Sequence, residues 1–172
     1  MNLRNMACIY IFHEDKVLLM RKTSSRIFSK AGVVLWTAVG GHFENDELNE
    51  PRACVIREMF EETSLREDDI ENLTLKYLTM AIKDTEIRQQ YIYFADLANL
   101  DAELDECDEG ELHWIKVDDM FNLEMSISNT QVLQHYFQTG KDDNLVYVAA
   151  IKVDAGSPKA VFTPLQDFDR KY

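Results

Sequence analysis

Three glutamates, Glu58, Glu61 and Glu62, are spaced so that one turn of a helix would crowd their carboxylates together. Like charges at these spacings repel each other on a helix surface by roughly 0.2–0.5 kcal/mol per pair. Solvent, a basic side chain or a metal cation must offset this repulsion. Carboxylates clustered beside an exposed backbone carbonyl are the hard oxygen ligands that Mg²⁺ and Mn²⁺ prefer. Gly40 and Gly41, upstream of the glutamates, allow such a close approach of the backbone.

The segment that carries these glutamates has the pattern of an amphipathic helix. Asn49, Glu50 and Pro51 provide its start, with a capping residue, an acid and a proline in the first turn. At about 100° per residue, the core-facing arc is predicted to hold Ala53, Val55, Ile56, Met59, Phe60 and Thr63. The remaining arc holds the three glutamates with Arg57 and Cys54. A solvated polar face is the alternative interpretation of this arc.

The rest of the chain predicts strands around this helix and a second helix further on. Strands are predicted at residues 7–12, 17–21, 33–41, 73–82, 87–97, 111–117, 145–153 and 159–165. The first two form a hairpin, and residues 23–32 form a loop. Asn129 is placed to cap the second helix, which Gly140 ends. This order of elements indicates an α+β fold with a mixed sheet.

Length and composition fit one globular domain with a sizeable core. The chain has 172 residues, of which 46% are hydrophobic and 28% charged. We expect a single domain over residues 1–172, with a core at about 3–139 and a C-terminal extension of strands at 140–172. No apolar run approaches the roughly 20 residues that span a bilayer, and no signal peptide is recognisable. A cytoplasmic protein with no membrane partner is therefore expected.

The charge and the missing motifs exclude several classes of function. A net charge of −13 argues against long nucleic acids, because Lys and Arg supply most of the affinity for phosphate backbones. A small anionic substrate stays compatible if metal ions screen the acids. Cys8, Cys54 and Cys107 lack disulfide or zinc spacing and are expected to be buried thiols. Neither a GxSxG elbow nor a GxxxxGK[ST] loop occurs.

The stretch from Gly41 to Leu65 resembles the Nudix box. That box is a glycine, five residues, a glutamate, seven residues, and then Arg-Glu-aliphatic-any-Glu-Glu-any-Gly-aliphatic. Here Glu47 follows Gly41 at the same interval, but nine residues precede the Arg-Glu-x-x-Glu-Glu core. Alignment from the core instead puts Asn49 at the first acidic position. Ser64 replaces the glycine after the helix, at a cost of about 1 kcal/mol if the left-handed ending is kept.

The resemblance implies a fold, a cofactor and residue roles. Nudix enzymes are Mg²⁺-dependent hydrolases of nucleoside diphosphates linked to another group, with an α/β/α sandwich around a mixed sheet. Mg²⁺ or Mn²⁺ would be bound by Glu58, Glu61, Glu62 and the Gly41 carbonyl, while Arg57 orients the glutamates, held in turn by Glu47. Glu109 would add a further acid and a metal ligand, with Asp108 next and Glu44 a weaker candidate. The general base is either Glu58 or Glu109.

The substrate is less clearly indicated than the reaction. Residues 76–97 and the segments after them look similar to MutT-type enzymes, which hydrolyse oxidised purine nucleoside triphosphates such as 8-oxo-dGTP. In such enzymes an aromatic and polar side chains hold the base, and here Phe121, Asn122 and Asn129 occupy that stretch. The sequence is equally compatible with Asn129 acting as the N-cap of the second helix. His42 lies in the site loop and could contact substrate, whereas Trp36 and Trp114 are expected in the core.

Three functional hypotheses follow. The first is a nucleoside triphosphate pyrophosphohydrolase that releases a monophosphate and pyrophosphate. The second keeps the site but cleaves ADP-ribose or a nucleotide sugar. The third is a nucleotide-binding domain that has lost turnover, in keeping with the longer loop and Ser64. A homodimer is compatible with the sequence, although no residue indicates one.

Overall fold

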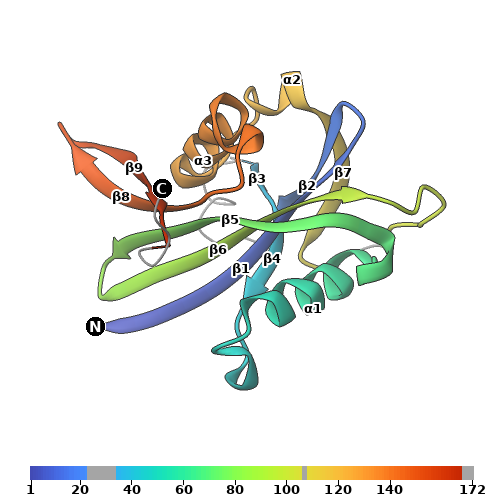
Figure 1. Cartoon of the computed structure of the whole chain (residues 1–172), viewed down its shortest axis with the longest axis horizontal. Coiled ribbons are helices and arrows are strands. Elements are labelled where there is room, and N and C mark those ends of the chain that lie inside the picture. Colours follow the sequence, from blue (N-terminus) through green and yellow to red (C-terminus); the bar gives the residue numbers. More distant parts are fainter. Residues whose placement is uncertain (23–33, 106–107, 168–172) are drawn as a thin grey trace.

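A mixed sheet forms the centre of the fold, with helices on both faces (Figure 1). The computed structural model describes residues 1–22, 34–105 and 108–167. The strands are β1 (Asn2–His13), β2 (Lys16–Lys22), β3 (Leu35–Thr37), β4 (Val39–His42), β5 (Ile70–Lys83), β6 (Glu86–Leu97), β7 (Gly110–Lys116), β8 (Val146–Asp154) and β9 (Ser157–Leu165). The helices are α1 (Pro51–Thr63), α2 (Val117–Met120) and α3 (Ile127–Gln138). The predicted loop at 23–32 lies outside the described residues, as does Cys107.

The sheet order is β3-β2-β1-β6-β5-β8-β9, with β4 paired to β1 and β7 paired to β2. The pairs β1–β6 and β5–β8 are parallel, and the other pairs are antiparallel. One apolar core packs α3 on one face, around Tyr10, Leu19 and Leu133. A second core packs α1 on the opposite face, around Ile9, Leu18 and Met59. The α+β fold with a mixed sheet between helices is therefore confirmed.

The single strand predicted at residues 33–41 is wrong, because this segment forms two strands with different partners. β3 pairs with β2, whereas β4 pairs with β1. Gly40 has φ +144°, and a Cβ there would lie 2.2 Å from the carbonyl oxygen of Ala7 in β1. Only glycine allows this close approach. The glycine pair thus fixes β4 against β1, and β4 leads directly toward α1.

Both predicted helix starts are off by one or more residues. The residue before α1 is Glu50, not Asn49, and it makes no side-chain cap bond. The cap of α3 is Ser126, whose Oγ accepts a hydrogen bond from the backbone N–H of Asn129 at 3.2 Å. Asn129 is therefore inside the helix, and its side chain is not used for capping. Gly140 begins a short 3₁₀ turn after α3.

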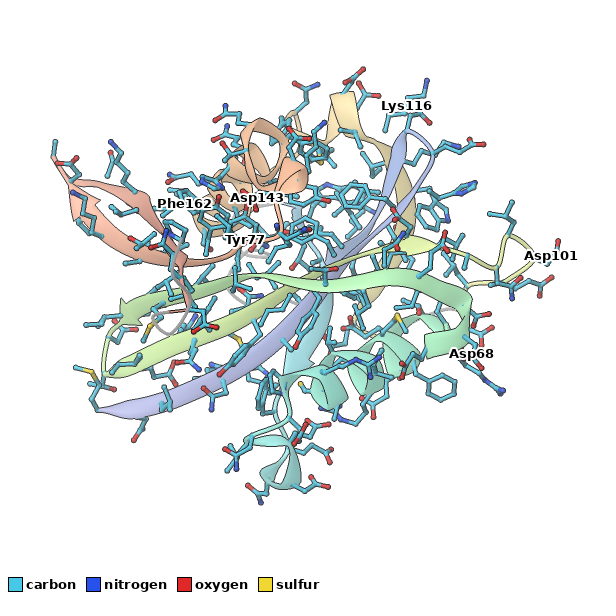
Figure 2. The ribbon with its side chains drawn as sticks, in the orientation of Figure 1. Asp68, Tyr77, Asp101, Lys116, Asp143 and Phe162 are labelled. Carbon is cyan, nitrogen blue, oxygen red and sulfur yellow. The ribbon has the colours of Figure 1, made fainter. Side chains whose placement is uncertain are left out.

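Aromatic side chains join the C-terminal hairpin to the body of the fold. Tyr77 of β5 stacks on Tyr147 of β8, with ring centroids 5.7 Å apart, and meets Phe162 of β9 edge-on at 5.9 Å. The Tyr147 hydroxyl donates to Asp143 at 2.6 Å, and the buried Lys76 ammonium also bonds Asp143, at 3.0 Å. Figure 2 shows Tyr77, Asp143 and Phe162 close together below α3. The hairpin is thereby held as a continuation of the sheet.

None of the described helices is both long enough and apolar enough to cross a membrane.

The end of α1 has the left-handed backbone that a glycine would favour. Ser64 has φ 63°, and its N–H donates to the carbonyl of Phe60 at 2.8 Å. Its hydroxyl also donates to Asp105 at 2.5 Å. The serine therefore keeps the helix ending and adds one contact, which offsets part of the conformational cost.

A pair of substitutions at Ser64 separates these two effects. Ser64→Ala and Ser64→Gly both remove the hydroxyl, but only glycine relieves the left-handed backbone. We expect the glycine variant to be more stable than the alanine variant by about 1 kcal/mol. That difference corresponds to roughly 2–4 °C in Tm for a chain of this size, measured by calorimetry. Equal melting temperatures would show that the backbone at residue 64 is not strained.

Candidate active site

Glu62 on α1 is a buried carboxylate with one oxygen in a hydrogen bond and the other without one. Its side chain is 5% exposed, and its Oε2 accepts a hydrogen bond from the N–H of Gly40 at 2.7 Å. Among the described residues its Oε1 has no hydrogen-bond partner, and the Lys22 ammonium lies 3.7 Å away. Burial raises the pKa of Glu62 to about 7, against the opposing effects of Gly40 and Lys22. A buried oxygen of this kind is suited to a ligand.

Glu58 lies one helical turn before Glu62 and directly against the backbone of Gly41. A Cβ added to Gly41 would be 2.4 Å from Oε2 of Glu58, so any other residue would displace the carboxylate. Burial also raises the pKa of Glu58. Glycine at this position therefore leaves the Glu58 carboxylate where it is, and strand β4 places its backbone next to the two glutamates.

Arg57 ties the loop before α1 to the acidic face of the helix. Its Nε and Nη2 donate to the two oxygens of Glu47 at 2.7 and 2.9 Å, a bidentate pair. Its Nη1 donates to Glu58 at 3.0 Å and to Glu61 at 2.8 Å, and its Nη2 also donates to the carbonyl of His42 at 3.0 Å. The hydrogen bond from Arg57 lowers the pKa of Glu47 to about 2. Of the two alignments left open, Glu47 is the residue that contacts Arg57.

The core-facing arc predicted for α1 is wrong in part. Ala53 and Phe60 are exposed, whereas Cys54 and Glu62 are buried together with Val55, Met59 and Thr63. The helix is rotated so that part of its acidic arc faces the sheet. A hydrophobic pattern cannot foresee this, because it assigns every carboxylate to solvent. The solvated-face interpretation fails for Glu62 and holds for the exposed Glu61.

Lys22, which the sequence analysis did not single out, connects Glu62 with Glu109. Its ammonium forms an ion pair with Glu109 and lies 3.7 Å from Glu62. Glu109, predicted as a further acid, therefore lies beside the buried carboxylate of α1. Asp108 and Glu44 are exposed, and the backbone N–H of Glu44 donates to Glu47 at 2.9 Å. Lys22 ends β2, whose four central residues, Val17–Met20, are apolar, and its position at the end of this run was its one sequence signal.

The acids fit a hard divalent cation, although they are held by basic side chains here. In the described part of the chain, no three His, Cys, Asp or Glu side chains are arranged as a metal site. Arg57 holds Glu58 and Glu61, while Lys22 contacts Glu62 and Glu109. The Glu62 oxygen without a hydrogen bond and the Glu58 carboxylate beside Gly41 are nonetheless oxygen donors of the kind that Mg²⁺ and Mn²⁺ take.

A cavity of about 510 Å³ opens beside Lys22, between the sheet and the start of α3. One wall comes from β1, β5 and β6, and the other comes from β3 and α3. Its lining includes Arg4, Met6, Lys22, Trp36, Thr79, Arg88, Gln90, Ser128, Asn129 and Ile151. Trp36 is partly buried and lines this cavity as well as packing on the core.

The substrate residues predicted from the sequence separate into two groups. Asn129 is 5% exposed and lines the cavity, and its side-chain amide makes no hydrogen bond to any other described residue. His42 lies at the edge of this region, where its Nε2 accepts a hydrogen bond from Arg4 at 2.5 Å. Phe121 and Asn122 follow α2, are exposed and do not line the cavity. The structure therefore does not bring these two together with Asn129.

Comparisons with known proteins agree with this architecture. The model of one protein family, described as the NUDIX domain, matches residues 1–136. The mutator MutT protein of Bacillus halodurans superposes with a TM-score of 0.70 at 19% identity, covering 92% of this chain and 97% of that protein. An Ap4A hydrolase of C. elegans superposes with a TM-score of 0.63 at 14% identity, covering 83% of this chain and 100% of that protein. An ADP-ribose pyrophosphatase of Streptococcus suis superposes with a TM-score of 0.54 at 17% identity, covering 79% of this chain and 92% of that protein.

Proposed function

The chain belongs to the Nudix family of diphosphate-cleaving hydrolases, and on that premise we propose that it is a nucleoside triphosphate pyrophosphohydrolase. It would use Mg²⁺ or Mn²⁺ and convert an oxidised purine nucleotide such as 8-oxo-dGTP to the monophosphate and pyrophosphate. The observation that carries this proposal is the buried Glu62 carboxylate. Its Oε1 accepts no hydrogen bond from the described residues and lies 3.7 Å from the ammonium of Lys22, which lines the cavity.

The metal would be held by residues that α1 and β4 bring together. We assign Glu58, Glu61, Glu62 and the carbonyl of Gly41 to this role, with Glu109 as a further ligand. When bound, the divalent cation would lower the pKa of a water molecule and neutralise charge on the phosphoryl oxygens. Gly41 contributes by its lack of a side chain, because a Cβ would displace the Glu58 carboxylate.

The remaining residues of the site position groups and handle charge. Arg57, held by Glu47, keeps Glu58 and Glu61 in place on α1. Lys22 is a cation next to the carboxylates and on the lining of the cavity, where it would bind a phosphate oxygen of the substrate. Either Glu58 or Glu109 would accept the proton of the attacking water.

The cavity suits a purine on the wall formed by β3 and α3. The amide of Asn129 offers both a donor and an acceptor, which is the pattern that paired hydrogen bonds to a purine edge require. Trp36 supplies an aromatic surface beside it. Asn129 lacks a hydrogen-bond partner among the described residues, so bound base would satisfy a buried polar group. With a net charge of −13, we expect a small nucleotide as substrate, not a long nucleic acid.

Product analysis tests this function directly. The purified protein would be incubated with Mg²⁺ and 8-oxo-dGTP, dGTP, ADP-ribose or a nucleotide sugar, and the products separated by ion-exchange chromatography. We expect the monophosphate and pyrophosphate, formed fastest from 8-oxo-dGTP. Exclusive cleavage of ADP-ribose or the nucleotide sugar would replace the proposed substrate class. Metal-dependent binding without turnover would instead identify a nucleotide-binding domain.

Asn129 provides a second prediction, on substrate preference. Asn129→Ala removes the amide, and we expect kcat/KM for purine triphosphates to fall roughly 10- to 100-fold, the value of one or two buried hydrogen bonds. Phe121→Ala, which alters an exposed side chain outside the cavity, is the matched control and should retain wild-type rates. A fall with Phe121→Ala but not with Asn129→Ala would move base recognition to the segment after α2.

A further inference from the structure

The cavity is basic although the protein as a whole is acidic. The chain has 31 acidic and 18 basic residues. Within the described part of the chain, the residues that line the cavity nevertheless include three basic side chains, Arg4, Lys22 and Arg88, and no acidic one. A concave surface of one sign concentrates counter-ions of the opposite sign. Lys22 is compensated by Glu62 and Glu109, so the charge available to an anion in the cavity comes from the two arginines.

Arg4 and Arg88 lie directly opposite each other on neighbouring strands. Arg4 of β1 and Arg88 of β6 are partners in the parallel register of these strands. Like charges directly opposite each other destabilise a sheet, so the pair needs compensation. Glu86 provides some, because its Oε2 accepts from Arg88 at 3.0 and 3.2 Å and lies 3.7 Å from Arg4. One carboxylate shared by two guanidinium groups leaves one positive charge in excess.

The arginine pair is connected to the end of β4, the strand that precedes α1. Arg4 donates from Nε to His42, which directly follows Gly41 at the end of β4. Gly41 in turn lies against the Glu58 carboxylate. Lys22 thus lies beside Glu62, and Arg4 of the arginine pair lies beside His42. The wall that carries Asn129 and Trp36 comes from other elements, β3 and α3.

We infer that Arg4 and Arg88 form a subsite for the terminal phosphate of a nucleoside triphosphate. The inference rests on the proposed function. A triphosphate that is cleaved between its α- and β-phosphates also carries a terminal γ-phosphate, and no residue of the candidate active site is assigned to bind it. Planar guanidinium groups bind phosphate through paired, charge-assisted hydrogen bonds. A phosphate at this point would also compensate the excess charge of the pair. The subsite would make the enzyme select triphosphates over diphosphates.

The test compares the selectivity of wild-type protein and variants for dGTP over dGDP, as a ratio of kcat/KM values. Arg88→Ala is expected to reduce this ratio roughly 10-fold, and Arg88→Lys to restore part of it, since lysine keeps the charge without the paired geometry. Arg52→Ala is the matched control, because Arg52, at the start of α1, is likewise an arginine paired with a single glutamate, Glu67. It should leave the ratio unchanged. An equal loss for both nucleotides in Arg88→Ala would overturn the subsite and indicate a structural ion pair.

A binding measurement keeps the subsite separate from the reaction. Titration calorimetry with tripolyphosphate and with pyrophosphate, in EDTA, reports anion binding even if no nucleotide is hydrolysed. We expect tripolyphosphate to bind more tightly than pyrophosphate to the wild-type protein, and Arg88→Ala to weaken tripolyphosphate roughly 10-fold. If turnover is absent but this difference is found, the subsite stands and the proposed function fails. If turnover of triphosphates is found but Arg88→Ala changes neither binding nor selectivity, the subsite is wrong and the proposed function stands.

Discussion

Replacing Glu62 with glutamine is expected to lower kcat roughly 100- to 1,000-fold while leaving the fold intact. Glutamine has nearly the same shape, and its amide oxygen can still accept the hydrogen bond that Gly40 donates to Glu62 at 2.7 Å. The change removes the negative charge and one oxygen ligand at the point where the carboxylate oxygen is buried without a hydrogen bond. Loss of a charged ligand from a catalytic metal site removes transition-state stabilisation, with little effect on packing.

The measurement is a steady-state assay with Mg²⁺, combined with thermal unfolding of the same preparations. Glu71→Gln is the control, since Glu71 is an exposed acid on β5 and is not part of the candidate active site. It should show wild-type kcat and Tm. Turnover of Glu62→Gln within about fivefold of wild type would remove Glu62 from the proposed ligand set. A large fall in Tm would show that the carboxylate has a structural role. The kinetics of Glu58→Gln would then show whether the carboxylates of α1 bind the metal.

Sequence alone predicted the parts of the site that are close together in the chain. Glu58 and Glu62 are one helical turn apart, so helix geometry alone brings them together once α1 forms. The glycine pair was identified for a similar reason, because it directly precedes the helix loop. The role of these glutamates as metal ligands stays a prediction. What the structure adds is their environment, above all the burial of Glu62 against β4.

The basic side chains of the site could not be found in this way. Lys22, Arg4 and Arg88 lie at the ends or edges of three different strands, and no local spacing connects them. Their meeting depends on strand register: β1 pairs in parallel with β6 and antiparallel with β4. The rotation of α1 was missed for a related reason. A buried carboxylate at Glu62 opposes the hydrophobic pattern, and only the contact with Gly40 reveals it.

Glu47, in the longer loop before α1, binds Arg57 through both of its carboxylate oxygens. Glu47→Gln should destabilise the protein by roughly 2–3 kcal/mol, because it breaks the bidentate pair with Arg57 while both side chains are largely buried. This corresponds to a fall in Tm of roughly 4–12 °C. Activity should fall as well, by roughly 10- to 100-fold, since Arg57 also holds Glu58 and Glu61. Asn49→Ala is the control, because Asn49 occupies the alternative motif position and is exposed.

The pH dependence of stability gives an independent measurement of the same pair. Arg57 lowers the pKa of Glu47 to about 2 from an ordinary value of 4.5, so the folded protein favours the charged carboxylate. The stabilisation is therefore complete above about pH 4.5 and is lost as the pH falls through the folded-state pKa, near 2. Wild type and Glu47→Gln should differ most in unfolding free energy near neutral pH and converge in acid. A difference independent of pH would mean that glutamine disturbs packing, not charge.

If Asn49→Ala instead lost stability and activity while Glu47→Gln did not, the loop would hold Arg57 through the other alignment. The two extra residues thus have a physical consequence that can be measured: they determine which side chain reaches back to the arginine that orders the acidic helix.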